Sequence, residues 1–283
     1  MSNERIRNKI MQELPNKPVL VCKILLAYLT GIPLEHNIRL WTGQTMRACL
    51  ADGSIMHTAL WGNNEPEVSD MMKSVLSPGA NFADGGANVG LFTAIGYHFV
   101  GDRGKIISIE PTPRTFNILK NNVKHWSPFA ISIHQLALSD KIGFTYINDF
   151  GPRRSGLNTL GQLPRDQPHL KGTKVLVPTT TLDHLIDSCP VNLIKLDLEE
   201  WEYLALLGAQ NILNTIRPHI IFETGNDNTD QVILLLRTAN YKFFAVTEGK
   251  LKLIDEGDVP RYLNVLASPN PNKSYPLILL LCF

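Results

Sequence analysis

The chain has 283 residues, of which 44% are hydrophobic and 19% charged, a composition typical of a soluble globular protein with one large core. Its 27 lysine and arginine residues nearly balance 26 aspartate and glutamate residues, so no global field attracts nucleic acid or an anionic membrane. The four cysteines show neither metal-ligand spacing nor a disulfide framework, and we therefore expect a cytoplasmic protein.

Residues 1–54 are predicted to form an N-terminal extension packed on the core, a helical arm followed by short strands. Within the arm, Ile6, Ile10 and Leu14 recur at helical spacing. The remaining residues, 55–283, are expected to form a single domain.

Two apolar segments have to be considered as candidates for a membrane span or a secretion signal. The run over residues 18–29 is too short to span a bilayer and contains Lys23, so we expect a packed helix in place of a membrane span or secretion signal. The C-terminal run over residues 275–283 is shorter still, and we expect a buried edge strand.

From residue 66 onward the pattern is that of an α/β domain, with a helix over residues 66–77 followed by alternating strands and helices. The predicted strands cover residues 81–84, 105–110, 130–136, 191–197, 218–223, 241–247 and 262–267, and the helices cover residues 89–99, 113–124, 181–188, 199–208 and 228–239. Alternation at this spacing predicts a doubly wound, mostly parallel sheet of seven strands, with Gly249 turning a hairpin between the last two.

The alternation breaks between the third and fourth strands. Residues 149–172 hold three prolines and four glycines, and extended runs flank them on both sides. Irregular loops of this length carry specificity, so we expect recognition of a substrate here. The basic residues of the loop would either contact a phosphate or carboxylate or remain solvated; they are Arg153, Arg154, Arg165, His169 and Lys171.

The most informative motif is the glycine turn after the first strand. Asp84 is followed by Gly86, Asn88 and Gly90 at the start of a helix, the arrangement that presents backbone N–H groups to a ligand. The third glycine of a dinucleotide-binding turn is missing, and asparagine adopts left-handed conformations at low cost. Because the next strand ends in Glu110, which can accept ribose hydroxyls, the turn suits S-adenosylmethionine better than NAD.

Residues 84–93 resemble the cofactor motif of the FkbM family of S-adenosylmethionine-dependent methyltransferases. Four further segments match that family in order, over residues 109–122, 137–140, 181–202 and 218–223. The resemblance covers about residues 55–250 and implies the Rossmann-like fold of class I methyltransferases. One departure is Glu200, which stands where the family usually has glycine and puts the local shape or charge of the acceptor side in question.

The resemblance and the topology place the cofactor at the carboxyl ends of the strands, where carboxylates would face a sulfonium cation. Glu110 is expected to bind the ribose, and the resemblance places adenine contacts at Ser139 and Asp140. The full set of expected cofactor contacts is Asp84, Gly86, Asn88, Gly90, Glu110, Ser139, Asp140 and Asp197.

The acidic segment Asp197–Glu202 supplies the expected catalytic residues Asp197, Glu199 and Glu202. Asp197 ends an apolar strand and would face the transferring methyl group, whereas Glu199 and Glu202 are three apart and would share a helix face. The two glutamates would orient an acceptor hydroxyl, bind a hard cation such as Mg²⁺ or simply complement the helix dipole; we predict no metal. The base is left open among Asp197, Glu199 and a histidine such as His219 or His169.

We therefore expect an O-methyltransferase that acts on a hydroxyl of a small molecule, either a sugar or a natural product. After the fourth strand the chain has Asp-Leu-Glu-Glu in place of the Asn-Pro-Pro-aromatic run of enzymes that methylate amino groups of bases. One alternative is an NAD(P)-dependent oxidoreductase, which the glycine spacing disfavours. Another is a non-catalytic methyltransferase-like binding protein, which Glu200 favours. Nucleic acid is not an expected partner because the chain lacks a basic stripe with aromatic residues.

Overall fold

The computed structural model describes residues 17–269 apart from residues 63, 127–129, 161–170 and 187–189. The helix predicted around Ile6, Ile10 and Leu14 and the strand predicted over residues 275–283 lie outside the described residues, as do Arg165 and His169.

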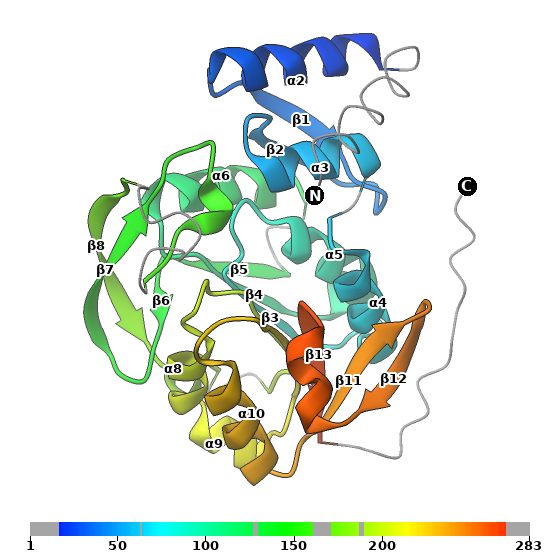
Figure 1. Ribbon diagram of the computed structural model, residues 1–283, viewed down its shortest axis with the longest axis vertical. Helices are drawn as coiled ribbons and strands as arrows, with labels where there is room; N and C mark the ends of the chain where they lie inside the picture. Colours follow the sequence, from blue (N-terminus) through cyan, green and yellow to red (C-terminus); the bar gives the residue numbers. More distant parts are fainter. Residues whose placement is uncertain (1–16, 63, 127–129, 161–170, 187–189, 270–283) are drawn as a thin grey trace.

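The core is an eight-stranded sheet with the order β12-β11-β13-β10-β9-β3-β4-β5 (Figure 1). Its strands are β3 (Phe82–Gly85), β4 (Ile106–Ile109), β5 (Ile131–His134), β9 (Leu193–Leu196), β10 (His219–Glu223), β11 (Lys242–Thr247), β12 (Lys250–Ile254) and β13 (Asn264–Ser268). The first five of these pair in parallel, whereas β13 runs antiparallel to both β10 and β11. The prediction of a mostly parallel sheet is confirmed.

The eighth strand differs from the predicted count of seven. Gly249, with φ +69°, turns the chain directly after β11, and the following residues pair antiparallel with β11 as β12. The hairpin at Gly249 therefore extends the sheet at its edge and does not connect β11 to β13, which the chain reaches only after residues 256–261.

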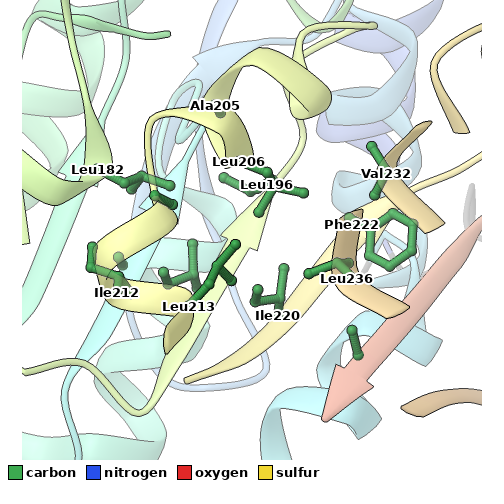
Figure 2. Packing of buried hydrophobic residues seen from close by; sticks show 14 of the residues in the cluster. Leu182, Leu196, Ala205, Leu206, Ile212, Leu213, Ile220, Phe222, Val232 and Leu236 are labelled. Atoms are coloured by element: carbon green, nitrogen blue, oxygen red, sulfur yellow. The ribbon is translucent and has the colours of Figure 1, made fainter. Parts of the chain in front are cut away.

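Helices cover both faces of the sheet. One face packs against α4 (Pro66–Val75), α5 (Leu91–Val100) and α6 (Pro113–Val123), and the other against α7 (Leu182–Ile186), α8 (Glu202–Leu207), α9 (Gln210–Thr215) and α10 (Thr229–Thr238). Side chains alternate along β10, so that Ile221 enters the first core and Ile220 and Phe222 enter the second. Figure 2 shows the second core with Ile220 and Phe222. Because both faces of the sheet are buried, the sequences of these strands are nearly continuous runs of apolar residues.

The N-terminal elements lie together at one end of the molecule (Figure 1). They are α2 (Pro18–Thr30), β1 (Glu35–Arg39), β2 (Thr45–Cys49) and α3 (Gly53–Trp61). Their buried side chains form a cluster with Val89 and Ala94 of the core domain. In addition, the Asn122 amide accepts from the Arg47 backbone N–H at 2.8 Å and donates to the Arg47 carbonyl at 3.0 Å. Within the described ranges, no helix combines the length and apolar character that crossing a membrane requires.

A small three-stranded sheet forms where the predicted alternation breaks. It has the order β6-β8-β7, with β6 (Ala137–Leu138), β7 (Gly143–Asp149) and β8 (Thr173–Thr180). The chain between β7 and β8 begins with residues 150–160, which return to the carboxyl ends of the large sheet.

Candidate active site

A cavity of about 420 Å³ lies at the carboxyl ends of β3, β4, β9 and β10. Parallel α/β sheets bind ligands at this edge, and the volume suits a small molecule or cofactor. Its floor comes from residues 86–89, 109–112 and 197–199 together with Glu223, and its walls come from the start of α3 and from the loop over residues 153–160.

The glycine turn has the backbone conformation that its sequence predicts. Gly86, Asn88 and Gly90 have φ values of +78°, +50° and +103°. A Cβ added to Gly86 would overlap the carbonyl oxygen of Asp197, so only glycine allows β3 and β9 to approach so closely here. Gly86 and Asn88 line the cavity, whereas Gly90 stands at the start of α5 and packs against Leu119.

Glu110 lies beneath this turn with only 6% of its surface exposed. One carboxylate oxygen accepts from the Asn88 N–H at 3.0 Å and the other from the Thr112 N–H at 2.9 Å. Burial raises the pKa of Glu110 to about 7, although the hydrogen bonds from Thr112 and Asn88 oppose this shift. Because each carboxylate oxygen can accept a second hydrogen bond, the side chain retains the capacity to bind a diol at the cavity wall.

Four of the expected cofactor contacts lie outside the cavity lining: Gly90, Asp84, Ser139 and Asp140. Asp84 is fully buried and accepts from the Thr93 hydroxyl at 2.6 Å, so it ties β3 to α5 and not to the backbone of the turn. Its second oxygen has no hydrogen-bond partner among the described residues. Ser139 follows β6 and donates to Asp140 at 3.0 Å, and neither residue contributes to the cavity wall.

A carboxylate cluster forms the polar end of the cavity. Asp197, Glu199 and Glu223 each offer an oxygen atom within 4.8 Å of the others. Burial, followed by the charge of Asp197, raises the pKa of Glu199 to about 9 and that of Glu223 to about 8. Such a cluster attracts positive charge, whether a sulfonium group or a divalent ion, and these are the described residues that could hold a metal.

Glu202 has a different position from the one predicted. Glu199 and Glu200 adopt left-handed conformations with φ +51° and +76°, so α8 begins only at Glu202 and the expected shared helix face with Glu199 does not exist. Glu202 is 1% exposed and accepts from the Leu198 N–H at 2.7 Å. Glu202 therefore stabilises the turn through this hydrogen bond and is not part of the cavity lining. His219, one of the candidate bases, is the first residue of β10. It therefore lies at the amino end of this strand, whereas the cavity lies at the carboxyl ends of the strands.

Two charged residues that the sequence analysis did not single out belong to this region. Lys195, in the middle of β9, is 1% exposed, with its Nζ atom 2.9 Å from an Asp197 oxygen and 4.5 Å from the centre of the Phe92 ring. Burial alone would lower its pKa, but the charges of Asp197, Asp84 and Glu65 outweigh burial and raise it. A lysine inside an otherwise apolar strand was the available signal in the sequence.

Glu65, the second of these residues, lines the cavity from the start of α4. It has φ +53°, and one carboxylate oxygen accepts from the Asn264 amide at 3.3 Å. Burial and the charge of Asp197 raise its pKa to about 7, opposed by Lys195. The available signal was the resemblance of residues 61–67 to the family segment that closes over the cofactor, in which Glu67 and not Glu65 matches the family's acid.

The loop over the cavity is attached at three points. The hydrogen bonds run from the Ser155 N–H and hydroxyl to Asp52 at 2.8 and 2.9 Å, from the Asn158 amide to the Thr112 hydroxyl at 3.3 Å, and from the Thr159 hydroxyl to the Glu199 carbonyl at 2.6 Å. The loop is thus bound both to the N-terminal elements and to the acidic end of the cavity.

Comparison with solved structures places the chain near several methyltransferases. It is similar to methyltransferase FkbM from Methylobacillus flagellatus KT, with a TM-score of 0.46 and 16% identity, covering 76% of this chain and 52% of that chain, so the match spans about half the length of that protein. It is also similar to an S-adenosylmethionine-dependent O-methyltransferase from Thermotoga maritima, with a TM-score of 0.38 and 13% identity over 84% of this chain and 79% of that chain. A third similar structure is Aeropyrum pernix fibrillarin with natively bound S-adenosylmethionine, with a TM-score of 0.40 and 11% identity over 82% of this chain and 93% of that chain. Curated protein sequences give no match.

The family assignment rests on a different comparison. The family model of the methyltransferase FkbM domain matches residues 84–243, which is more than half of the 283 residues and includes the glycine turn, Glu110 and the acidic cluster. The donor groups of the cavity are chemically compatible with the cofactor of that family, because Glu110 can accept from a diol and the clustered carboxylates favour a sulfonium cation. The chain belongs to the FkbM family of S-adenosylmethionine-dependent methyltransferases.

Proposed function

We propose that the protein transfers a methyl group from S-adenosylmethionine to a hydroxyl oxygen of a small molecule, a sugar or a natural product. The carboxylate cluster of Asp197, Glu199 and Glu223 beside the glycine turn carries this proposal. A hydroxyl group must lose its proton as its oxygen bonds to the methyl carbon, and a positioned carboxylate can accept that proton. The nicotinamide alternative receives no support from the family assignment.

The cofactor would bind along the glycine turn, with its ribose on Glu110 and its methionine portion beside Gly86 and Asn88. The bound cofactor supplies a methyl group on a sulfonium sulfur and leaves as S-adenosylhomocysteine. Asp84 supports this site from inside the sheet through its hydrogen bond to Thr93. Adenine contacts at Ser139 and Asp140 stay a prediction.

Glu199 is the base in this proposal. Its pKa of about 9 makes its carboxylate a strong proton acceptor for this residue type, and a cation in the cavity would favour the ionised form that is needed. The ion pair with Lys195 would hold the Asp197 carboxylate in the orientation that faces the methyl group. Glu202 would act indirectly, by holding the Leu198 N–H and so the turn that carries Glu199.

We further propose that residues 1–54 form an extension that completes the cavity and that residues 55–283 form the methyltransferase domain. The contacts of Arg47 with Asn122 and of Asp52 with Ser155 support this division, since both join the extension to the core.

The test is a methyl-transfer assay with S-adenosylmethionine and a panel of hydroxylated small molecules, read as S-adenosylhomocysteine release and product mass. We expect Glu199→Gln to lower kcat by about 100-fold or more while S-adenosylhomocysteine affinity changes little. Glu248→Gln, at an exposed acid on the β11–β12 hairpin, is the matched control. Methylation of nitrogen or carbon, or no transfer to any hydroxyl, would contradict the proposal.

A further inference from the structure

One wall of the cavity carries two arginines that the reaction proposed above does not use. Arg153 and Arg154 line the cavity and are exposed to solvent. Neither guanidinium forms a hydrogen bond or ion pair with a described residue. The Arg153 guanidinium lies against Gly31 at the end of α2, where an added Cβ would be 2.6 Å from its Nη1 atom.

The backbone that carries these arginines is fixed in place. Ser155, the next residue, is 7% exposed and donates its N–H and hydroxyl to Asp52, and its hydroxyl also lies 3.2 Å from the Asn88 amide oxygen. The backbone next to the arginines is therefore held beside the glycine turn by these hydrogen bonds.

Two acids near the arginines, Asp149 along the chain and Asp52 through its bonds to Ser155, already have partners. Asp52 accepts from Ser155 and from Ser54, and Asp149 accepts from Arg114 at 2.8 and 3.3 Å. The positive charge of Arg153 and Arg154 is thus left uncompensated by the described residues, and both residues line the same cavity as the carboxylate cluster.

A cavity with carboxylates at one site and guanidinium groups at another selects an acceptor with a matching charge distribution. An anionic group would gain nothing beside the carboxyl groups of Glu199 and Glu223, whereas it would form charge-assisted, bidentate hydrogen bonds with arginine. Resting on the proposed function, we propose that Arg153 and Arg154 bind a carboxylate or phosphate of the acceptor, which makes the substrate a hydroxylated anion such as a sugar acid or sugar phosphate. The bound anion turns the hydroxyl end of the acceptor toward Glu199.

The first experiment titrates inorganic phosphate into the full chain saturated with S-adenosylhomocysteine, for wild type, the double variant Arg153→Gln/Arg154→Gln and the control Lys174→Gln. Lys174 is an exposed cation on β8 outside the cavity lining. We expect phosphate affinity to fall at least about tenfold in the double variant and to stay within about twofold in the control. Affinity for S-adenosylhomocysteine should change less than about twofold in both.

The second experiment compares methyl transfer to glucose, glucuronate and glucose 6-phosphate. We expect the anionic compounds to be preferred and that preference to disappear in the double variant, through KM more than kcat. Equal phosphate binding in all three proteins would overturn the proposal and assign the arginines to a solvated loop. A matching loss of S-adenosylhomocysteine affinity would overturn it too, because the arginines would then hold the carboxylate of the cofactor. Arginine-dependent phosphate binding without methyl transfer to any hydroxyl would refute the proposed function and leave the anion site standing.

Discussion

Asp52 and Ser155 are joined by two hydrogen bonds that close one side of the cavity. Both residues are buried, at 3% and 7% exposure, and one Asp52 oxygen accepts from the Ser155 N–H at 2.8 Å and from its hydroxyl at 2.9 Å. The other oxygen accepts from the N–H and hydroxyl of Ser54 at 3.1 and 2.7 Å and so caps α3. A single carboxylate therefore joins the N-terminal elements to the loop over the cavity.

Replacing this carboxylate with an amide tests that connection. Asp52→Asn keeps one acceptor oxygen but turns an N–H group toward donors, and we expect the free energy of unfolding to fall by about 2 kcal/mol. Calorimetry should also show weaker S-adenosylhomocysteine binding, because the loop loses its attachment. Ser155→Ala, which retains the backbone hydrogen bond, should cost about half as much in urea denaturation. Equal stability of Asp52→Asn and wild type would show that the connection contributes nothing.

A second prediction concerns the close approach at Gly86. Gly86→Ala places a methyl group onto the Asp197 carbonyl oxygen at a φ of +78°, so we expect destabilisation of about 3 kcal/mol or more and loss of cofactor binding. Gly257→Ala is the control, since nothing lies within 4 Å of its added Cβ. Urea denaturation and S-adenosylhomocysteine titration measure both effects. An alanine variant that binds normally would place the cofactor away from this turn.

Most of the central fold follows from local sequence signals. The helix predicted over residues 113–124 is observed as Pro113–Val123, with Pro113 in its first turn, although the Thr112 side chain forms no cap hydrogen bond. The strands on either side agree within two residues. The left-handed conformation of Asn88 also follows from its residue type. These features depend on neighbours along the chain.

The features that the sequence did not predict depend on contacts between distant segments. Glu202 has the same residue type and nearly the same position as Glu199, yet it is buried behind the turn because the chain becomes left-handed at Glu199 and Glu200. Likewise, the place of Glu65 at the cavity depends on Asn264 from β13, almost the full length of the domain away. Carboxylate roles in this cavity are set by tertiary packing.

The raised pKa values of the cluster predict how stability changes with pH. Glu199 and Glu223 have ordinary values of 4.5 and folded values of about 9 and 8, so between these limits the folded state holds protons that the unfolded state releases. The free energy of unfolding should therefore fall as pH rises from about 5 to 9. Urea denaturation at pH 6, 7 and 8 measures this slope. Glu199→Gln should flatten it by up to about 1 kcal/mol per pH unit, whereas Glu248→Gln should not.

The same cluster predicts proton release on cofactor binding. A sulfonium cation near Glu199 and Glu223 lowers their pKa values, whereas the neutral sulfur of S-adenosylhomocysteine does not. Calorimetry at pH 7.5 in two buffers of different ionisation enthalpy should show more protons released with S-adenosylmethionine than with S-adenosylhomocysteine. Equal release with the two ligands would place the sulfonium away from the carboxylates.

Variants of Glu200 test whether this glutamate, which stands where the family usually has glycine, destabilises the fold or takes part in the function. It holds φ +76°, a conformation that costs a non-glycine residue about 1–2 kcal/mol, and its carbonyl is fixed by the Asn228 amide at 2.8 Å. Glu200→Gly removes this strain but adds freedom to the unfolded chain, so we expect a net gain of up to about 1 kcal/mol in urea denaturation. Glu200→Gln keeps the strain and removes the charge, and it should leave stability nearly unchanged. Since the charge of Glu200 also raises the pKa of Glu199, and Glu199 must lose its proton to act as the base, both variants should shift the rising, acid-side limb of the activity profile to lower pH. Higher turnover with glycine alone would mean that the strain limits the enzyme, whereas a loss of turnover in both variants would assign the carboxylate itself to the acceptor site.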